Sequence, residues 1–284
     1  MIFGHKVQLN YFKTLKEKNS FFSSFLFLGR EGIGKLTFAL ELAKSLTLPQ
    51  EILVISRNER VFQKNTNLPW QFFKNSIGIE KVKNLIDFLN LTSTQKKFGI
   101  IDEAELLTFE AQNALLKILE EPPKNSHLIL ITSFPGKLLE TVLSRLVKIS
   151  FFPLSSAEIE TFLKENFKNL EEEEIKKIAA VSLGSPKKAL EILENKEKYF
   201  SFKEKVFCVL NSSLKERLEF LEELKEEEMP LFFEELFLFL EKELLEKKDK
   251  KSLELLKKLL KTYFLFSSKK VDSRFLLESF ILSF

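Results

Sequence analysis

The feature that most constrains the fold of this chain is a glycine-rich loop between an apolar run and a helical pattern. The run Phe25–Leu28 is followed by Gly29–Lys35, which fits G-x-x-x-x-G-K. In this pattern the glycines let backbone N–H groups turn toward a phosphate, and the following helix adds a favourable dipole. The residues expected to bind phosphate are Gly29, Gly32, Gly34 and Lys35. The loop predicts an α/β fold; the alternative is a glycine-rich turn that binds nothing.

The residue after Lys35 departs from this pattern. A Ser or Thr at that position ligates Mg²⁺ through its hydroxyl, whereas this chain has Leu36. Thr37 comes next, but one step along a helix turns a side chain by about 100°, so Thr37 is a poor replacement. We therefore expect ATP and Mg²⁺ to be possible ligands whose binding Leu36 weakens, and we expect intrinsic hydrolysis to be weak or absent.

Short apolar runs alternate with amphipathic stretches through the first half of the chain. Near-continuous apolar strands between helices predict a parallel sheet that is covered on both faces. The expected strands are Phe25–Leu28, Ile52–Ser56, Phe98–Ile101, Leu128–Thr132 and Val147–Phe151. The expected helices are Lys35–Leu46, Ile79–Leu89 and Phe109–Glu120.

The pattern changes after Pro153, because only helical patterns follow. A capping-box spacing opens at Ser155, and a break at Gly184–Pro186 precedes another helix. From about Tyr199 the chain is rich in Leu, Phe, Lys and Glu, and breaks such as Met229-Pro230 indicate about four more helices. The expected domains are an α/β domain over residues 1–152, a small helical domain over 153–197 and a helical bundle over 198–284.

A second motif ends the strand expected over Phe98–Ile101. Asp102 and Glu103 follow it directly. Carboxylates at such a strand end typically hold Mg²⁺ through water and polarise an attacking water, which makes Asp102 a cofactor-binding candidate and Glu103 a possible general base. Thr132, at the end of the next strand, is a candidate sensor of the γ-phosphate. The alternatives are solvated acids at a strand boundary and an ordinary turn hydroxyl.

Several longer segments resemble bacterial DNA polymerase III clamp-loader subunits, which are AAA+ proteins. These segments are Glu103–Leu107, Asn113–Pro123 and Thr141–Arg145. Ile77–Glu80 and Gly184–Leu190 resemble the delta-prime branch of the family in particular. The resemblance extends to about residue 195. It implies a P-loop AAA+ parallel-sheet domain, a small helical lid domain and a C-terminal helical bundle that serves as an oligomerisation collar.

The resemblance also implies a role in DNA replication, in a hetero-oligomer that loads a sliding clamp onto primed DNA. Its partners would be motor subunits of the gamma or tau kind and a delta-like subunit, and it would meet the clamp and DNA through the complex. Arg145 matches an arginine that reaches into a neighbouring subunit's ATP site. Lys187 stands where motor subunits carry an arginine that touches their own nucleotide. The alternative is an ATP-hydrolysing motor subunit of the same family.

The composition of the chain limits which other kinds of protein and binding site are possible. Cys208 is the only cysteine, so a disulfide framework and a four-cysteine zinc module are excluded, and no metal ligand set is predicted. The family's zinc segment, which corresponds to Pro49–Trp70, has no cysteine. The net charge of +3 gives little support to a third candidate, a P-loop protein that binds DNA alone. No apolar run of about 18 residues and no signal-peptide core are found, so a cytoplasmic protein without membrane contact is expected.

Overall fold

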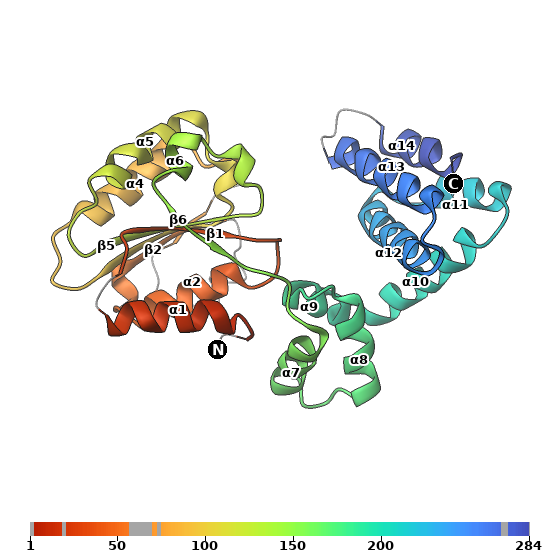
Figure 1. Cartoon of the computed structure of the whole chain (residues 1–284), viewed down its shortest axis with the longest axis horizontal. Helices are drawn as coiled ribbons and strands as arrows, with labels where there is room; N and C mark the ends of the chain where they lie inside the picture. The colour runs from red at the N-terminus through yellow and green to blue at the C-terminus, as the bar shows by residue number, and fades with distance from the viewer. Residues whose placement is uncertain (1–2, 19–20, 57–69, 73–74, 268–271, 284) are drawn as a thin grey trace. The chain divides into compact units, whose positions relative to one another are not determined.

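The computed structural model of the chain describes residues 3–18, 21–56, 70–72, 75–267 and 272–283. Within these residues, six parallel strands form one sheet (Figure 1), and their order is β3-β2-β4-β5-β1-β6. The strands are β1 (Ser24–Leu28), β2 (Ile52–Ser56), β3 (Trp70–Phe72), β4 (Lys97–Ile101), β5 (Ser126–Thr132) and β6 (Val147–Ser150). All five expected strands are present, and the short edge strand β3 is additional. Residues 57–69 of the expected zinc-free segment lie outside the described residues.

Helices cover both faces of the sheet (Figure 1). One face carries α1 (Lys6–Glu17) and α2 (Lys35–Lys44), and the other carries α4 (Ile79–Asn90), α5 (Phe109–Glu120) and α6 (Glu140–Leu143). Successive residues of β1 point to opposite faces. Phe25 and Phe27 share a core with Phe38 of α2, while Leu26 packs in a second core with Leu115 of α5. The expected parallel sheet with two covered faces is therefore confirmed.

Three short helices follow β6. They are α7 (Ser156–Asn166), α8 (Glu172–Val181) and α9 (Pro186–Glu194). The Ser155 hydroxyl accepts a hydrogen bond from the Glu158 N–H, and the Glu158 carboxylate accepts one from the Ser155 N–H, which confirms the expected capping box. The Leu154 N–H donates to the Gly184 carbonyl at 2.9 Å. This bond ties the segment that leaves β6 to the turn before α9.

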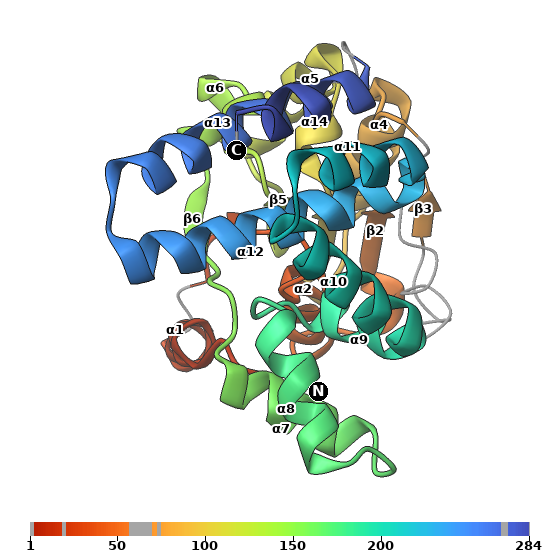
Figure 2. The same ribbon diagram turned by 90° about the vertical axis from the view of Figure 1, so that its right-hand side faces the viewer.

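The chain divides into two compact units, Met1–Leu193 and Glu194–Phe284. Helices α7 to α9 belong to the first unit, so a separate domain over residues 153–197 stays a prediction. The described helices of the second unit are α10 (Lys196–Leu210), α11 (Leu214–Glu223), α12 (Met229–Lys247), α13 (Lys250–Ser267) and α14 (Ser273–Ile281). Within this unit α12 packs along α13, and α14 packs against α11 and α13 (Figure 2). Large apolar side chains such as Phe232 and Phe280 fill the core between them.

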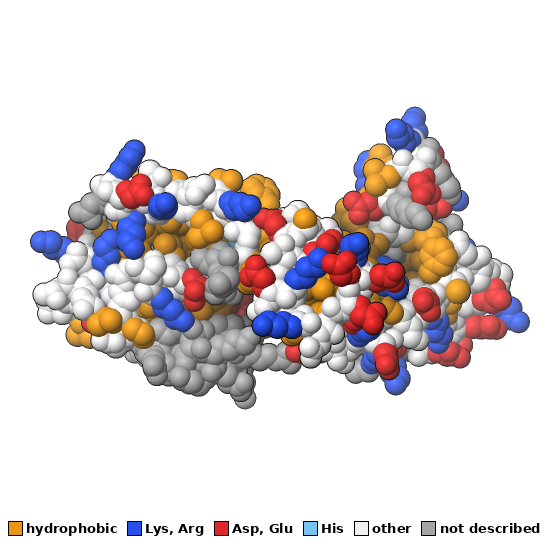
Figure 3. Space-filling view, turned by 90° about the horizontal axis from the view of Figure 1, so that it is seen from below, with side chains coloured by type: hydrophobic (Ala, Val, Ile, Leu, Met, Phe, Trp, Pro, Cys, Tyr) orange, Lys and Arg blue, Asp and Glu red, His pale blue; other side chains and the backbone are white. Residues whose placement is uncertain are grey.

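The break expected near Met229-Pro230 is confirmed, because α11 ends at Glu223 and α12 begins at Met229. Proline fits the first turn of a helix, where its missing N–H has no partner to lose. Its place in an apolar-rich sequence predicts that Cys208 is a small buried side chain. This prediction is wrong, because Cys208 on α10 is exposed. Within the described ranges, no helix combines the length and the apolarity that crossing a bilayer requires. Basic and acidic side chains are interspersed on the face shown in Figure 3.

Candidate functional site

The glycine-rich loop joins β1 to α2, as the motif requires. Gly32 and Gly34 have φ angles of 78° and 98°, which only glycine adopts without strain. Gly34 is the N-cap of α2, and Lys35 is the first helical residue. The first N–H groups of a helix have no acceptor within it, and the dipole places positive potential there. The loop therefore has the backbone conformation and the position of a phosphate cradle.

The Lys35 ammonium is bound by its own loop. Its Nζ donates to the carbonyl oxygens of Gly29 and Arg30 at 2.6 and 2.7 Å and to the Ser133 hydroxyl at 3.3 Å. These three bonds use all three donors of the ammonium. Burial lowers the pKa of Lys35, and the nearby charge of Asp102 opposes that effect. An incoming phosphate must therefore replace acceptors that the loop itself supplies.

The two residues after Lys35 diverge. Leu36 is partly buried and packs against the core beneath α2, and Thr37 is exposed. The position that a metal-binding hydroxyl would take is thus apolar. The cradle fits a nucleotide phosphate, while the ligand set for Mg²⁺ is incomplete at this position. In the described ranges, no cluster of three or more His, Cys, Asp or Glu side chains could hold a metal ion.

Asp102 and Glu103 lie at the carboxyl end of β4. The Ser56 hydroxyl, at the end of β2, donates to Asp102 Oδ2 at 3.3 Å. Burial and the adjacent Glu103 charge raise the pKa of Asp102 to about 7, although the Ser56 bond and the Lys35 charge favour its ionised form. Glu103 has a left-handed backbone conformation, with φ 53°. Asp102 is therefore close enough to Lys35 for their charges to interact.

Thr132, the candidate γ-phosphate sensor, forms a hydrogen bond with Glu105, a residue that the motifs did not place in the site. Its hydroxyl donates to Glu105 Oε2 at 2.7 Å, and the Ser133 N–H donates to Glu105 Oε1 at 3.4 Å. Glu105 lies on the 3-10 turn η2 (Ala104–Leu106) that follows β4. Because β4 and β5 are parallel neighbours, their carboxyl ends share one edge. That adjacency was the signal that could have pointed to Glu105.

Lys187, at the start of α9, also lies against the loop. Its Nζ forms an ion pair with Glu31 Oε1 at 2.5 Å. Burial by itself would lower the pKa of Lys187, but the hydrogen bond and the charge of Glu31 outweigh burial, and the pKa is raised. The structure thus brings Lys35, Asp102, Thr132 and Lys187 to one edge of the sheet.

Arg145 is held elsewhere, next to the ends of α5 and α6. Its Nη2 pairs with Glu120 Oε1 at 2.6 Å, and its Nη1 donates to the Thr141 carbonyl at 2.7 Å and to the Ser144 hydroxyl at 3.3 Å. The Arg145 side chain is 34% exposed. Helices α5 and α6 cover the face of the sheet opposite to α2 (Figure 1). Arg145 therefore contacts the C-terminal ends of these helices and not the loop of its own chain.

Comparison with known proteins assigns the family. The family described as DNA polymerase III, delta subunit, matches residues 4–155, which is more than half of the chain. The chain belongs to this family. The resemblance to clamp-loader subunits that the motifs indicated is thereby confirmed.

Two curated relatives of this family member illustrate the range of subunits it resembles. It is 34% identical over 157 residues to the DNA polymerase III subunit delta' of Bacillus subtilis, across 52% of this chain and 48% of that protein. It is 32% identical over 184 residues to the DNA polymerase III subunit gamma of Buchnera aphidicola subsp. Schizaphis graminum, across 61% of this chain and 51% of that protein. The chain thus spans about half the length of these relatives. Similarity alone does not separate the delta' type from the gamma type.

The fold of this family member is similar to that of RuvB. Its TM-score against a point mutant of RuvB from Thermotoga maritima is 0.52 at 17% identity, across 71% of this chain and 65% of that chain. Identity this low concerns the fold and not the function. The P-loop AAA+ α/β fold expected from the sequence, with helices toward the C-terminus, is confirmed.

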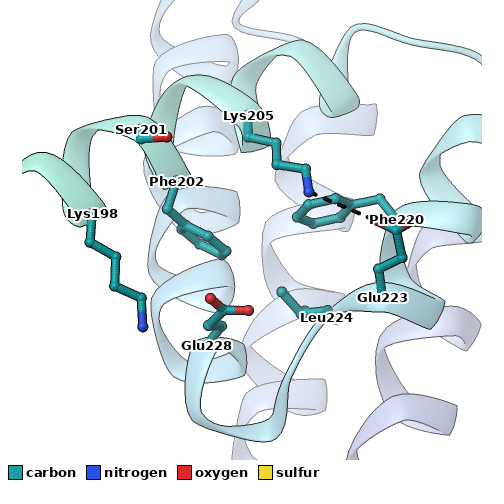
Figure 4. A pocket seen from close by; sticks show the side chains of 8 residues that line it. All are labelled: Lys198, Ser201, Phe202, Lys205, Phe220, Glu223, Leu224 and Glu228. Atoms are coloured by element: carbon teal, nitrogen blue, oxygen red, sulfur yellow. Dashed lines mark ion pairs between the residues drawn. The ribbon is translucent and has the colours of Figure 1, made fainter.

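A pocket lies in the helical unit, between α10, α11 and the turn before α12 (Figure 4). Phe202 and Phe220 line it, and Lys205 pairs with Glu223 at 3.8 Å. The Lys205 ammonium also lies 5.1 Å from the centre of the Phe220 ring. These contacts are made between α10 and α11, so the charged groups of the pocket support the junction of two helices.

The raised pKa of Asp102 leads to a prediction about how the stability of the protein depends on pH. Because its folded-state pKa of about 7 exceeds the ordinary value of 3.8, the folded chain keeps a proton that the unfolded chain releases between these values. This group therefore makes the free energy of unfolding fall as pH rises from about 4 to about 7. Asp102→Asn removes that contribution and should stabilise the protein at pH 8 relative to pH 5, by an amount on the order of a few kcal/mol. Urea unfolding of both proteins at the two pH values tests this, and parallel pH profiles would contradict it.

Proposed function

We propose that this chain is a delta'-type subunit of a DNA polymerase III clamp loader, in which Arg145 completes the ATP site of a neighbouring subunit. It would assemble with motor subunits of the gamma or tau kind and a delta-like subunit, and would meet the sliding clamp and primed DNA through that complex. A cytoplasmic location follows from this role. The observation that carries the proposal is the position of Arg145, which is partly exposed at the ends of α5 and α6 and bonds to Thr141, Ser144 and Glu120 and not to the loop of its own chain.

The present partners of Arg145 are ones that a phosphate can replace. Its ion pair with Glu120 is at the surface, with side chains 34% and 53% exposed. Such pairs contribute roughly 0–1 kcal/mol, because solvent screens them and two side chains must be ordered. A guanidinium binds phosphate oxygens through two parallel, charge-assisted bonds, which are stronger than neutral hydrogen bonds. Exchange from Glu120 to a neighbour's γ-phosphate would therefore cost little.

The loop of this chain supports the same assignment. Leu36 supplies no oxygen for Mg²⁺, and the Lys35 ammonium has three acceptors within its own chain. When bound, ATP would supply the phosphates for the cradle formed by Gly29–Lys35, but positioning of its metal would lack one ligand. A subunit of this kind would act mainly as a rigid part of the assembly and as the donor of an arginine.

A motor subunit of the gamma kind is the second candidate. It is favoured by the carboxylates Asp102 and Glu103, which lie at the strand end beside the loop, and by the similarity to a gamma subunit. In that role Glu103 would activate water and Lys187 would contact the nucleotide of its own chain. The two candidates differ in whether turnover by the complex needs the loop of this chain.

Lys35→Ala separates the two candidates. In a clamp loader reconstituted from this chain and the motor and delta-like subunits of the same organism, a delta'-type role predicts DNA-stimulated ATP turnover within about twofold of the unchanged complex. A motor role predicts loss of the turnover that this subunit contributes, because phosphate would lose the lysine charge. Lys44→Ala, which removes another cation from α2, is the matched control. A marked loss with Lys35→Ala alone would favour the motor role.

A further inference from the structure

The start of α9 is in direct contact with the middle of the glycine-rich loop. The Gly32 carbonyl oxygen accepts from the Ser185 hydroxyl at 3.1 Å and from the Lys187 N–H at 3.2 Å. A Cβ atom at Gly32 would lie 2.5 Å from Ser185 Oγ and 3.0 Å from Lys187 Cβ. The absence of a side chain at Gly32 is therefore what allows α9 to begin against the loop.

This contact brings two opposite charges together at the loop. Lys187 Nζ lies 2.5 Å from Glu31 Oε1 and 3.9 Å from Glu191 Oε1. Glu31 is itself a residue of the glycine-rich loop, two positions after Gly29. The side chains of Lys187 and Glu31 are 51% and 71% exposed, so ions in solution can reach the pair. A surface pair of this kind is weak enough for another anion to displace Glu31.

Both lysines that the sequence assigns to phosphate are thus occupied by acceptors of the chain itself. Lys35 binds two loop carbonyls and Ser133, and Lys187 binds Glu31. A polyphosphate offers Lys187 the same chemistry as Glu31, namely anionic oxygen atoms. The Glu31 carboxylate also repels a polyphosphate that enters the loop, since both are negatively charged.

We propose that the Glu31 carboxylate competes with polyphosphate for the Lys187 ammonium. Glu31 binds Lys187 and must be displaced before a nucleoside triphosphate can bind this lysine. The ion pair between Glu31 and Lys187 would then link the position of α9 to occupancy of the loop. This inference rests on the proposed ability of the loop to bind a nucleotide, and it does not depend on the role of Arg145.

Glu31→Gln tests the competition in the full chain without partners. Affinities for ATP and for inorganic triphosphate are measured by titration calorimetry. The amide keeps the size of the side chain and removes its charge, so both ligands should bind about fivefold more tightly at low salt. The gain should shrink near 0.5 M salt, because screening weakens exposed charge interactions. Glu41→Gln removes an equal charge from α2 and should change either affinity by less than about twofold.

A double variant makes the test specific for Lys187. If Glu31 acts mainly by occupying Lys187, most of the gain in affinity should disappear in Glu31→Gln/Lys187→Ala relative to Lys187→Ala alone, and only the part due to direct repulsion should remain. An unchanged or weaker affinity in Glu31→Gln, a gain that is as large without Lys187, or no triphosphate binding by Glu31→Gln would each overturn the proposal. The delta'-type role would stand or fall separately, on ATP turnover by the reconstituted complex.

Discussion

Arg145→Ala should lower the DNA-stimulated ATP turnover of a reconstituted clamp loader by about 10³-fold at the neighbouring ATP site that we propose Arg145 completes. An arginine supplied in trans neutralises charge on the transferred γ-phosphoryl group, and such arginines contribute roughly 10³–10⁵ in rate in nucleotide hydrolases. Assembly should be unaffected, because the side chain is exposed and its surface ion pair with Glu120 contributes little to folding. Steady-state turnover measures the first effect, and size-exclusion chromatography of the complex measures the second.

Two further variants sharpen this prediction. Arg145→Lys keeps the charge but loses the planar, two-pronged geometry, so it should restore only part of the activity. Lys148→Ala removes an exposed cation from β6, three residues away, and should leave turnover unchanged. If Arg145→Ala assembles and hydrolyses ATP at the normal rate, Arg145 is a surface residue that caps its own helix.

Gly184→Ala should be the most destabilising single-methyl addition among the loop glycines near α9. Gly184 has φ 72°, and an added Cβ would overlap the Leu154 carbonyl oxygen and lie 2.8 Å from the Leu154 nitrogen. These are backbone atoms, so they cannot turn away as a side chain could. The hydrogen bond from the Leu154 N–H to the Gly184 carbonyl would be distorted as well. We expect a loss of about 3 kcal/mol, from backbone strain and the forced displacement together.

Hydrogen exchange locates this loss. Amides of α7, α8 and α9 should lose about 100-fold of their protection in Gly184→Ala, since 1.4 kcal/mol corresponds to about tenfold. The matched control is Gly136→Ala, because a Cβ there would have no atom within 4 Å. That variant should change stability by no more than about 0.5 kcal/mol. Equal exchange in the two variants would show that Gly184 tolerates a side chain and that α9 is not held by this turn.

Most of the sheet could be predicted from the sequence, because buried parallel strands are short apolar runs bounded by helices. Among the elements that were not predicted, α1 and β3 escaped prediction for different reasons. The buried positions of α1 include Gln8 beside Phe12 and Leu15, which blurs its apolar face. Strand β3 has only three residues, too few to show a period, and it exists through pairing with β2.

The sequence predicted the lysines of the candidate site and its residues at the strand ends, but not the hydrogen bonds and ion pairs that these side chains form. Lys35, Asp102 and Thr132 were each assigned from a local motif, and the structure places them at one edge of the sheet. The sequence did not identify the carboxylates that bond to the side chains of this site. Glu105 binds Thr132, and Glu31 binds Lys187. A motif identifies a residue by its neighbours in the chain, and these contacts are made between segments.

Local order along the chain was enough to predict the glycine-rich loop between β1 and α2, the acidic strand end, the parallel sheet and the family, because each depends on residues within one or two turns or strands. Only folding decided which acceptor each cation has. Glu120 is 25 residues from Arg145, and Glu31 is 156 residues from Lys187. Hydrogen bonds and ion pairs act over a few ångströms in space, so a partner that distant in the chain becomes visible only once the sheet and helices bring the two segments together.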